Sequence, residues 1–100
     1  MIRHVVTFTW IDGTTADDVA EITARLRGLT AVIPELRSYA VGPDLGIGGT
    51  ADFAIVADFD DVAGYEAYRD HPEHEVVRST VIMPRVAARS AVQYEVPNPS

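Results

Sequence analysis

One short segment, residues 52–59 with the sequence DFAIVADF, constrains the fold more than any other part of the chain. Its β-branched and aromatic side chains favour a strand, and both alternating sets, Phe53-Ile55-Ala57-Phe59 and Ala54-Val56, are apolar. Apolar character on both faces is typical of a central strand. The segment therefore predicts a sheet with strands on both sides of residues 52–59 and with apolar side chains on both faces.

Three further segments have strand character. Residues 2–11 (IRHVVTFTWI) alternate, so that His4, Val6 and Phe8 share one face of the strand. Residues 36–42 (LRSYAVG) form a shorter strand that ends at a glycine, and residues 87–96 alternate polar and apolar side chains. Together with residues 52–59, these segments predict four strands.

Helical spacing separates the first strand from the second and the third from the fourth. After Thr15, a residue suited to cap a helix, apolar residues recur every three or four positions up to Pro34. That stripe consists of Val19, Ile22, Leu26, Leu29 and Ile33. A second helix begins after Asp60 or Asp61 and ends at His71-Pro72, and a short helix over residues 73–83 follows until Pro84.

The predicted order is β-α-β-β-α-β, which is the α+β, ferredoxin-like arrangement with an antiparallel four-stranded sheet. Because crossovers are right-handed, both helices are expected on the same face of the sheet. The other face is then uncovered and apolar, so we predict a homodimer, a dimeric α+β barrel in which two sheets pack face to face. We expect residues 1–96 to form a single domain and residues 97–100 to be a frayed tail.

Composition excludes several classes of partner and site. The 100 residues carry a net charge of −7, all eight basic residues are arginine, and none is cysteine. Binding to nucleic acid needs a concentrated basic patch, so no nucleic-acid partner is expected. Without cysteine there is no disulfide and no thiolate metal site. The apolar runs are shorter than the ~18 residues of a membrane span, and the start resembles a strand rather than an export signal, so we expect a cytoplasmic protein without a membrane partner.

The three histidines are the strongest candidates for chemistry. His4 has apolar neighbours two residues away on either side, so it is expected to be buried and to need a hydrogen-bond partner such as a backbone carbonyl. The run His71-Pro72-Glu73-His74 has three interpretations. It can be a corner between helices with Pro72 in the first turn, an acid–base site assisted by Tyr68, or part of a metal site that is short of ligands.

Three motifs resemble a known family. They are the opening Met1-Ile-Arg-His-Val-Val6, the helix end Ile33-Pro34-Glu-Leu36 and the run Tyr68-Arg-Asp-His71-Pro-Glu-His74. Together they resemble the stress-responsive A/B barrel (Dabb) family over residues 1–96. The resemblance implies a dimeric α+β barrel, in agreement with the strand and helix order.

The resemblance also implies candidate functions. One plant member of the family, a polyketide cyclase of the olivetolic acid type, closes a linear poly-β-ketone thioester by aldol condensation without a cofactor. The matching catalytic positions are His74, Tyr68 and His4, and a small apolar or polyketide-like ligand would lie between sheet and helices. No metal and no cofactor are expected. The residues expected to bind the ligand are Val6, Phe8, Ile22, Leu26, His71, Val77 and Arg78.

Two alternatives stay open. Other family members are stress-responsive proteins without established catalysis, so the domain can be non-catalytic, with a structural His-Pro-Glu-His corner. A relation to the dimeric α+β barrel monooxygenases is the second alternative. Arg78 has two interpretations as well: it pairs with an anionic ligand, or it is a solvated residue on a helix surface.

Overall fold

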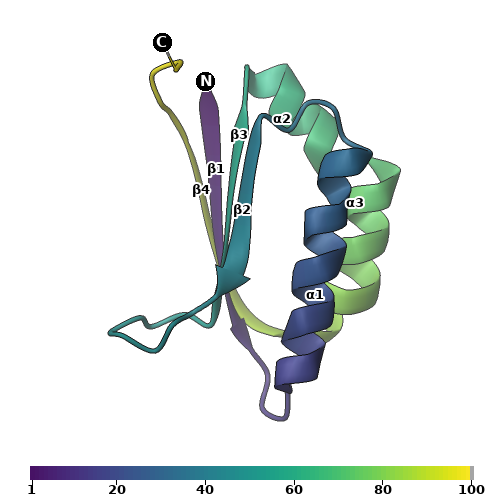
Figure 1. Ribbon diagram of the computed structural model, residues 1–100, viewed down its shortest axis with the longest axis vertical. Coiled ribbons are helices and arrows are strands. Elements are labelled where there is room, and N and C mark those ends of the chain that lie inside the picture. Colours follow the sequence, from purple (N-terminus) through teal and green to yellow (C-terminus); the bar gives the residue numbers. More distant parts are fainter. Residues whose placement is uncertain (100) are drawn as a thin grey trace.

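The computed structural model describes residues 1–99, and its elements follow the predicted order. Figure 1 shows the strands in one layer and the helices in a second layer beside it. The fold is ferredoxin-like, as predicted. The strands and helices are β1 (Ile2–Trp10), α1 (Ala16–Gly28), β2 (Ser38–Pro43), β3 (Phe53–Phe59), α2 (Val62–Arg69), α3 (Pro72–Val77) and β4 (Val86–Glu95).

The sheet has the strand order β2-β3-β1-β4, and all neighbouring strands are antiparallel. β3 pairs with β2 on one side and with β1 on the other, as its double-sided apolar pattern predicts. β1 also pairs with β4 along its whole length, from Ile2 opposite Glu95 to Trp10 opposite Val86. The first and last strands of the chain are therefore neighbours.

The apolar stripe of the first helical segment fills the core. Thr15 caps α1 through a reciprocal pair of bonds: its hydroxyl accepts from the Asp18 amide at 3.1 Å, and the Asp18 carboxylate accepts from the Thr15 amide at 2.9 Å. Ile22 and Leu26 are fully buried against the sheet. A turn of 3-10 helix, Leu29–Ala31, extends the helix towards Pro34.

The helix expected over residues 73–83 is shorter and less regular than predicted. α3 ends at Val77, a wider π-helical turn spans Arg78–Ile82, and a 3-10 turn spans Met83–Arg85. Two hydroxyls compete with the backbone here, since Ser79 donates to the carbonyl of Glu75 at 2.8 Å and Thr80 donates to that of Val76. Pro84 follows two residues after Ile82. It has no backbone N–H, so it cannot donate the hydrogen bond that would continue a regular helix.

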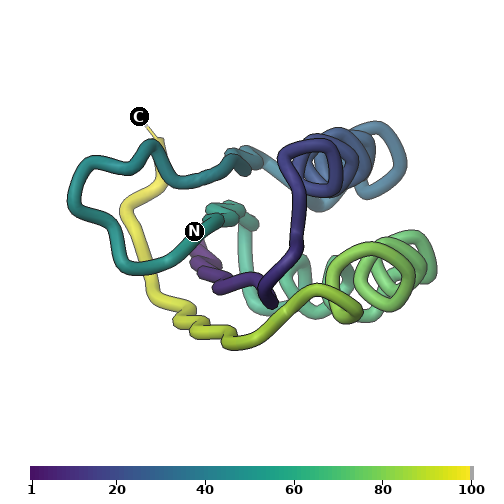
Figure 2. Tube along the Cα trace, turned by 90° about the horizontal axis from the view of Figure 1, so that it is seen from below, coloured from purple at the N-terminus to yellow at the C-terminus, as the bar shows by residue number. Residues whose placement is uncertain are grey.

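The two faces of the sheet differ in what covers them. The helices cover the face that carries His4, Val6 and Phe8, which are all buried. We call the opposite face the open face; it includes Val5, Thr7, Val56, Val92 and Tyr94, in register across β1, β3 and β4. Figure 2 shows the segment between β2 and β3 curving away on this side.

The open face also holds a polar group that the apolar strand pattern did not reveal. Asp58 on β3 is only 6% exposed and accepts two bonds from the Arg3 guanidinium, at 2.8 and 3.0 Å. The Ser38 hydroxyl on β2 donates a third bond at 2.9 Å. These bonds hold the pKa of Asp58 below its usual value, with the Arg3 bonds as the largest cause.

The ends of the described chain lie together. The Met1 amino group donates to the Val96 carbonyl at 3.1 Å and to the Asn98 side-chain oxygen at 2.6 Å. Residues 97–99 belong to no strand or helix, and the last residue of the predicted tail lies outside the described residues. Within residues 1–99, no helix has the length and apolar character needed to cross a membrane.

Candidate functional site

A pocket of about 240 Å³ lies between the sheet and the α2–α3 segment. Its lining combines apolar side chains with two imidazoles, two phenols and three arginines. The lining residues are His4, Val6, Phe8, Ile55, Tyr65, Tyr68, Arg69, His74, Arg78, Ile82, Met83 and Arg89. All three predicted catalytic residues lie on this one pocket.

Each candidate side chain reaches the pocket for a simple geometric reason. The period of two along β1 puts His4 on the helix-covered face with Val6 and Phe8. Tyr65 and Tyr68 are three residues apart on α2 and therefore share a face of that helix. His74 lies in the first turn of α3, which begins at Pro72 as the helix-corner interpretation predicts.

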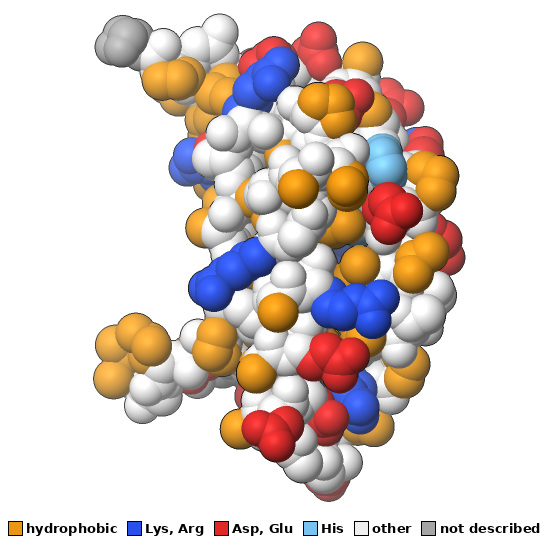
Figure 3. Space-filling model, turned by 45° about the vertical axis from the view of Figure 1, so that its right-hand side comes forward, with side chains coloured by type: hydrophobic (Ala, Val, Ile, Leu, Met, Phe, Trp, Pro, Cys, Tyr) orange, Lys and Arg blue, Asp and Glu red, His pale blue; other side chains and the backbone are white. Residues whose placement is uncertain are grey.

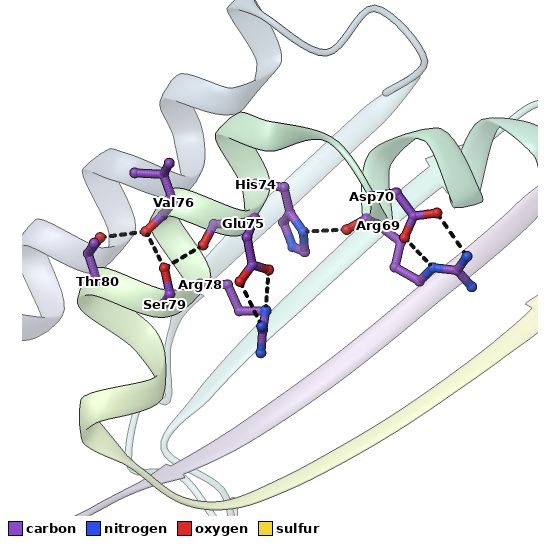
Figure 4. Close-up of polar contacts among 8 residues, drawn as sticks. All are labelled: Arg69, Asp70, His74, Glu75, Val76, Arg78, Ser79 and Thr80. Atoms are coloured by element: carbon purple, nitrogen blue, oxygen red, sulfur yellow. Dashed lines mark hydrogen bonds and ion pairs between the residues drawn. The ribbon is translucent and has the colours of Figure 1, made fainter.

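The tautomer of His74 follows from one hydrogen bond to the backbone. Its Nδ1 lies 3.1 Å from the carbonyl oxygen of Arg69, which only accepts, so Nδ1 carries the hydrogen (Figure 4). The lone pair of the neutral ring is then on Nε2. Burial is the main cause that lowers the pKa of His74; the bond to the Arg69 carbonyl raises it, and the nearby Arg78 and His4 lower it. The ring is consequently a neutral base at pH 7.

His4 has a similar arrangement with a different partner. Its Nδ1 lies 2.8 Å from the side-chain oxygen of Gln93 on β4, so the partner is an amide side chain rather than the expected backbone carbonyl. Burial lowers the pKa of His4, and the positive charge of Arg89 acts in the same direction. At neutral pH both imidazoles of the pocket are therefore uncharged.

Tyr68 connects the two imidazoles. Its ring centroid lies 4.3 Å from that of His74 and 6.1 Å from that of His4. Its hydroxyl is 2.9 Å from the hydroxyl of Tyr39 on β2. Burial raises the pKa of Tyr68 to about 12, so the phenol keeps its proton at neutral pH and can donate it in a hydrogen bond.

This arrangement is suited to moving protons. Two neutral imidazoles supply basic nitrogens, and a protonated phenol supplies a donor; the buried surroundings of His4 and Tyr68 strengthen such hydrogen bonds. Within residues 1–99, no three His, Asp or Glu side chains come together as a possible metal-binding group.

Comparison with known proteins places the chain in a family. The model of the stress-responsive A/B barrel domain matches residues 2–96. The chain belongs to this Dabb family. A solved structure from Thermobifida fusca, described as a dimeric ferredoxin-like protein of unknown function, is 46% identical, with 95% of this chain and 90% of that chain covered and a TM-score of 0.87.

Two solved structures of enzymes have a fold similar to that of this chain. A hydroxynitrile lyase from Passiflora edulis has a TM-score of 0.83 at 18% identity, with 99% of this chain and 95% of that chain covered. An antibiotic biosynthesis monooxygenase has a TM-score of 0.78 at 13% identity, with 98% and 100% covered. At these identities the likeness shows the fold alone. No curated protein matches the sequence.

Four predicted ligand-binding residues of the Dabb domain do not line the pocket. Ile22, Leu26 and Val77 are buried in the core, on the side of the helices that packs against the sheet. His71 is the N-cap of α3, where its Nδ1 accepts from the Glu73 amide at 3.1 Å. The helical stripe therefore serves packing, whereas Val6, Phe8 and Arg78 do line the pocket.

Several lining or supporting residues were missed from the sequence. Tyr39 and Gln93 contact the site through the hydroxyl of Tyr68 and the ring of His4. The strand register signals both, because Tyr39 lies opposite Ala57 and Gln93 lies opposite His4. Arg89 lies opposite Phe8, so the register also places it on the side of the pocket. This register cannot be assigned before the order of the strands is known.

Proposed function

We propose that this Dabb domain binds a small, largely apolar ligand in the 240 Å³ pocket and moves a proton on it without a cofactor. The observation that carries the proposal is the joint placement of His74, Tyr68 and His4 on that pocket. A polyketide-type cyclisation is the reaction that these groups fit, because a carbon between two carbonyls is acidic enough for a histidine to deprotonate.

The steps need only residues of this chain. Nε2 of His74 takes a proton from the carbon between two carbonyls, and the C–H electron pair moves into an enolate. The Tyr68 hydroxyl donates to the enolate oxygen, while Tyr39 can donate to Tyr68 and keep that proton pointed at the ligand. The enolate carbon then attacks the carbon of a further carbonyl in the same ligand, and a C–C bond forms. The carbonyl oxygen that was attacked becomes an alkoxide, which takes the proton back from His74.

A non-catalytic role is the second candidate, and one observation favours it. The bond from His74 to the Arg69 carbonyl joins the start of α3 to the end of α2, so this histidine also holds the corner between helices. In that case the His-Pro-Glu-His run maintains the fold. The two candidates differ in what happens when the basic nitrogen is removed and the corner bond is kept.

The substitution His74→Asn separates these roles. The asparagine amide can donate to the Arg69 carbonyl in place of Nδ1, but it has no basic nitrogen. The assay follows deuterium uptake at the central carbon of ethyl 2-benzylacetoacetate in D₂O by NMR, against the buffer background. We expect the wild-type protein to accelerate uptake, and His74→Asn and Tyr68→Phe to reduce the acceleration at least tenfold.

The matched control is His71→Asn, since His71 is a histidine of the same motif that lies off the pocket and asparagine is a good N-cap. Circular dichroism and thermal melting check that each variant folds. A wild-type rate equal to the buffer background would contradict the catalytic proposal. Equal rates for wild type and a folded His74→Asn variant would contradict the role of His74 and favour the structural candidate.

We also propose that the chain is a homodimer with the open faces of two sheets packed together. Val92 and Tyr94 on that face are 53% and 46% exposed in the single chain. The segment between β2 and β3 projects beyond the same face, and Leu45 and Ile47 in it are 82% and 83% exposed. Figure 3 shows hydrophobic side chains gathered on the projecting tip. The dimeric Thermobifida protein, which is 46% identical, supports this assembly.

A further inference from the structure

The three arginines that line the pocket are not equivalent. Arg69 forms two bonds to the carboxylate of Asp70, at 2.9 and 3.0 Å (Figure 4). Arg78 forms two bonds to the carboxylate of Glu75, both at 2.9 Å. Each of these guanidinium groups therefore has a carboxylate partner on its own helical segment, and its charge is largely compensated.

Arg89 has no such partner. Within residues 1–99, its side chain makes neither an ion pair nor a hydrogen bond, although it lines the pocket. Arg27 is the only other arginine of the eight without an ion pair in this part of the chain, and it lies off the pocket on α1, 3.4 Å from the Val41 carbonyl. An uncompensated positive charge thus lies at the site, in a molecule whose net charge is −7.

The register of β4 places the Arg89 side chain on the same pocket as His4 and His74. Arg89 lies opposite Phe8, on the helix-covered face and four residues from Gln93, which holds His4. Between them Ala91 lies opposite Val6 and contributes only a methyl group. The positive charge of Arg89 also acts on His4 and Tyr68: it is one of the smaller causes that lower the pKa of each, although burial raises the pKa of Tyr68 overall. The guanidinium and the proton-moving groups therefore share one pocket.

We infer that the pocket selects a ligand with an apolar body and a carboxylate, and that the guanidinium of Arg89 binds that carboxylate. Arginine presents parallel N–H donors that match the two oxygens of a carboxylate. The acidic protein otherwise repels such a ligand, so its attraction must come from a local charge. This inference rests on the proposed function only for the pocket; it names the class of ligand that the same site takes.

The test compares two inert ligands that differ by one charge, 3-phenylpropionate and 3-phenylpropionamide. Neither has a carbon between two carbonyls, so binding is measured without chemistry. The readout is the NMR shift of the His4 and His74 ring protons during titration at pH 7.8, where the histidines are neutral, and at low salt. We expect the wild-type protein to bind the carboxylate about tenfold more tightly than the amide, as is typical for a bond to a charged group.

The substitution Arg89→Gln is expected to bring the ratio of the two affinities close to one. Arg89→Lys keeps the positive charge but loses the two parallel N–H donors of the guanidinium, so an intermediate ratio of the two affinities is expected. The matched control is Arg27→Gln, which removes the same charge away from the pocket and is expected to keep the tenfold ratio. Equal wild-type affinities, no binding of either ligand, or an unchanged ratio in Arg89→Gln would overturn the inference.

The outcomes are independent of the proton-transfer proposal. Loss of the carboxylate preference in Arg89→Gln supports the ligand class whether or not the protein accelerates deuterium uptake. Conversely, deuterium uptake that depends on His74 supports proton transfer even when the affinity ratio is one. The two proposals can therefore fail separately.

Discussion

The bond between the hydroxyls of Tyr39 and Tyr68 gives a quantitative prediction. The two oxygens are 2.9 Å apart, Tyr68 is only 2% exposed, and burial raises the pKa of Tyr39 far above its usual value. Tyr68→Phe keeps the ring contacts with His74 and Phe59 but leaves the Tyr39 hydroxyl unpaired. The substitution removes a hydrogen bond between two uncharged groups and leaves the buried Tyr39 hydroxyl without a partner. Together these effects should lower the free energy of unfolding by about 2 kcal/mol.

The double substitution decides whether this explanation is right. Tyr39→Phe alone should lower the free energy of unfolding by a similar amount, because it leaves the Tyr68 hydroxyl without a partner. Removing both hydroxyls leaves two rings of matching shape and no orphaned group, so the double variant should lie within about 1 kcal/mol of the wild type. Urea unfolding of all four proteins, at one protein concentration, gives the coupling free energy, with m-values expected to stay constant.

The result that refutes this reasoning is simple additivity. If the double variant loses the sum of the two single effects, the hydroxyls do not interact, and the proposed role of Tyr39 in orienting Tyr68 fails with them. In thermal melts the single variants should unfold roughly 8–16 °C below the wild type, since about 1 kcal/mol corresponds to 4–8 °C in a domain of this size.

Three other predictions concern assembly and stability. Val92→Asp on the open face should convert the homodimer to a monomer in size-exclusion chromatography with light scattering at micromolar concentration, whereas Val62→Asp, a similarly exposed valine on α2, should remain dimeric; a wild-type monomer would contradict the assembly. Burial holds the pKa of His4 and His74 below that of the unfolded chain, so stability measured by urea unfolding should be constant above about pH 6.5 and fall below it, because the unfolded state then binds more protons; unchanged stability down to pH 5.5 would contradict this. Gly28→Ala, at the helical end of α1 where a methyl group meets no atom within 4 Å, should raise the unfolding free energy by about 0.5–1 kcal/mol in the same assay.

Local patterns carried most of the fold. The double-sided apolar strand, the helix cap at Thr15 and the prolines at helix ends each act over a few residues, so their effect is visible in the sequence. The irregular segment after Val77 was not predicted from the sequence. Hydroxyls there compete for the backbone carbonyls of Glu75 and Val76. The spacing of apolar residues contains no information about that competition.

The site was predictable only in part, for a related reason. His4 and His74 are identified by their motifs, but the partners that set their protonation, Gln93 and the Arg69 carbonyl, follow from the register of β4 and from the turn between helices. Ile22 and Leu26, which were predicted to bind a ligand, lie in the core and do not line this pocket. An apolar helical stripe looks the same whether it faces the sheet or a ligand, and here it packs against the sheet.

The pairing of β1 with β4 has a consequence for how the protein is made. Of the four strands of the sheet, the one that carries His4 is synthesised before the other three, and the one that carries its partner Gln93, together with Arg89, is synthesised after them. Contacts between residues so far apart in the chain form slowly, because a large loop must close first. During synthesis on the ribosome the helices and the β1–β3 pair can therefore form early, while the pocket gains its last wall only when β4 has emerged and docked.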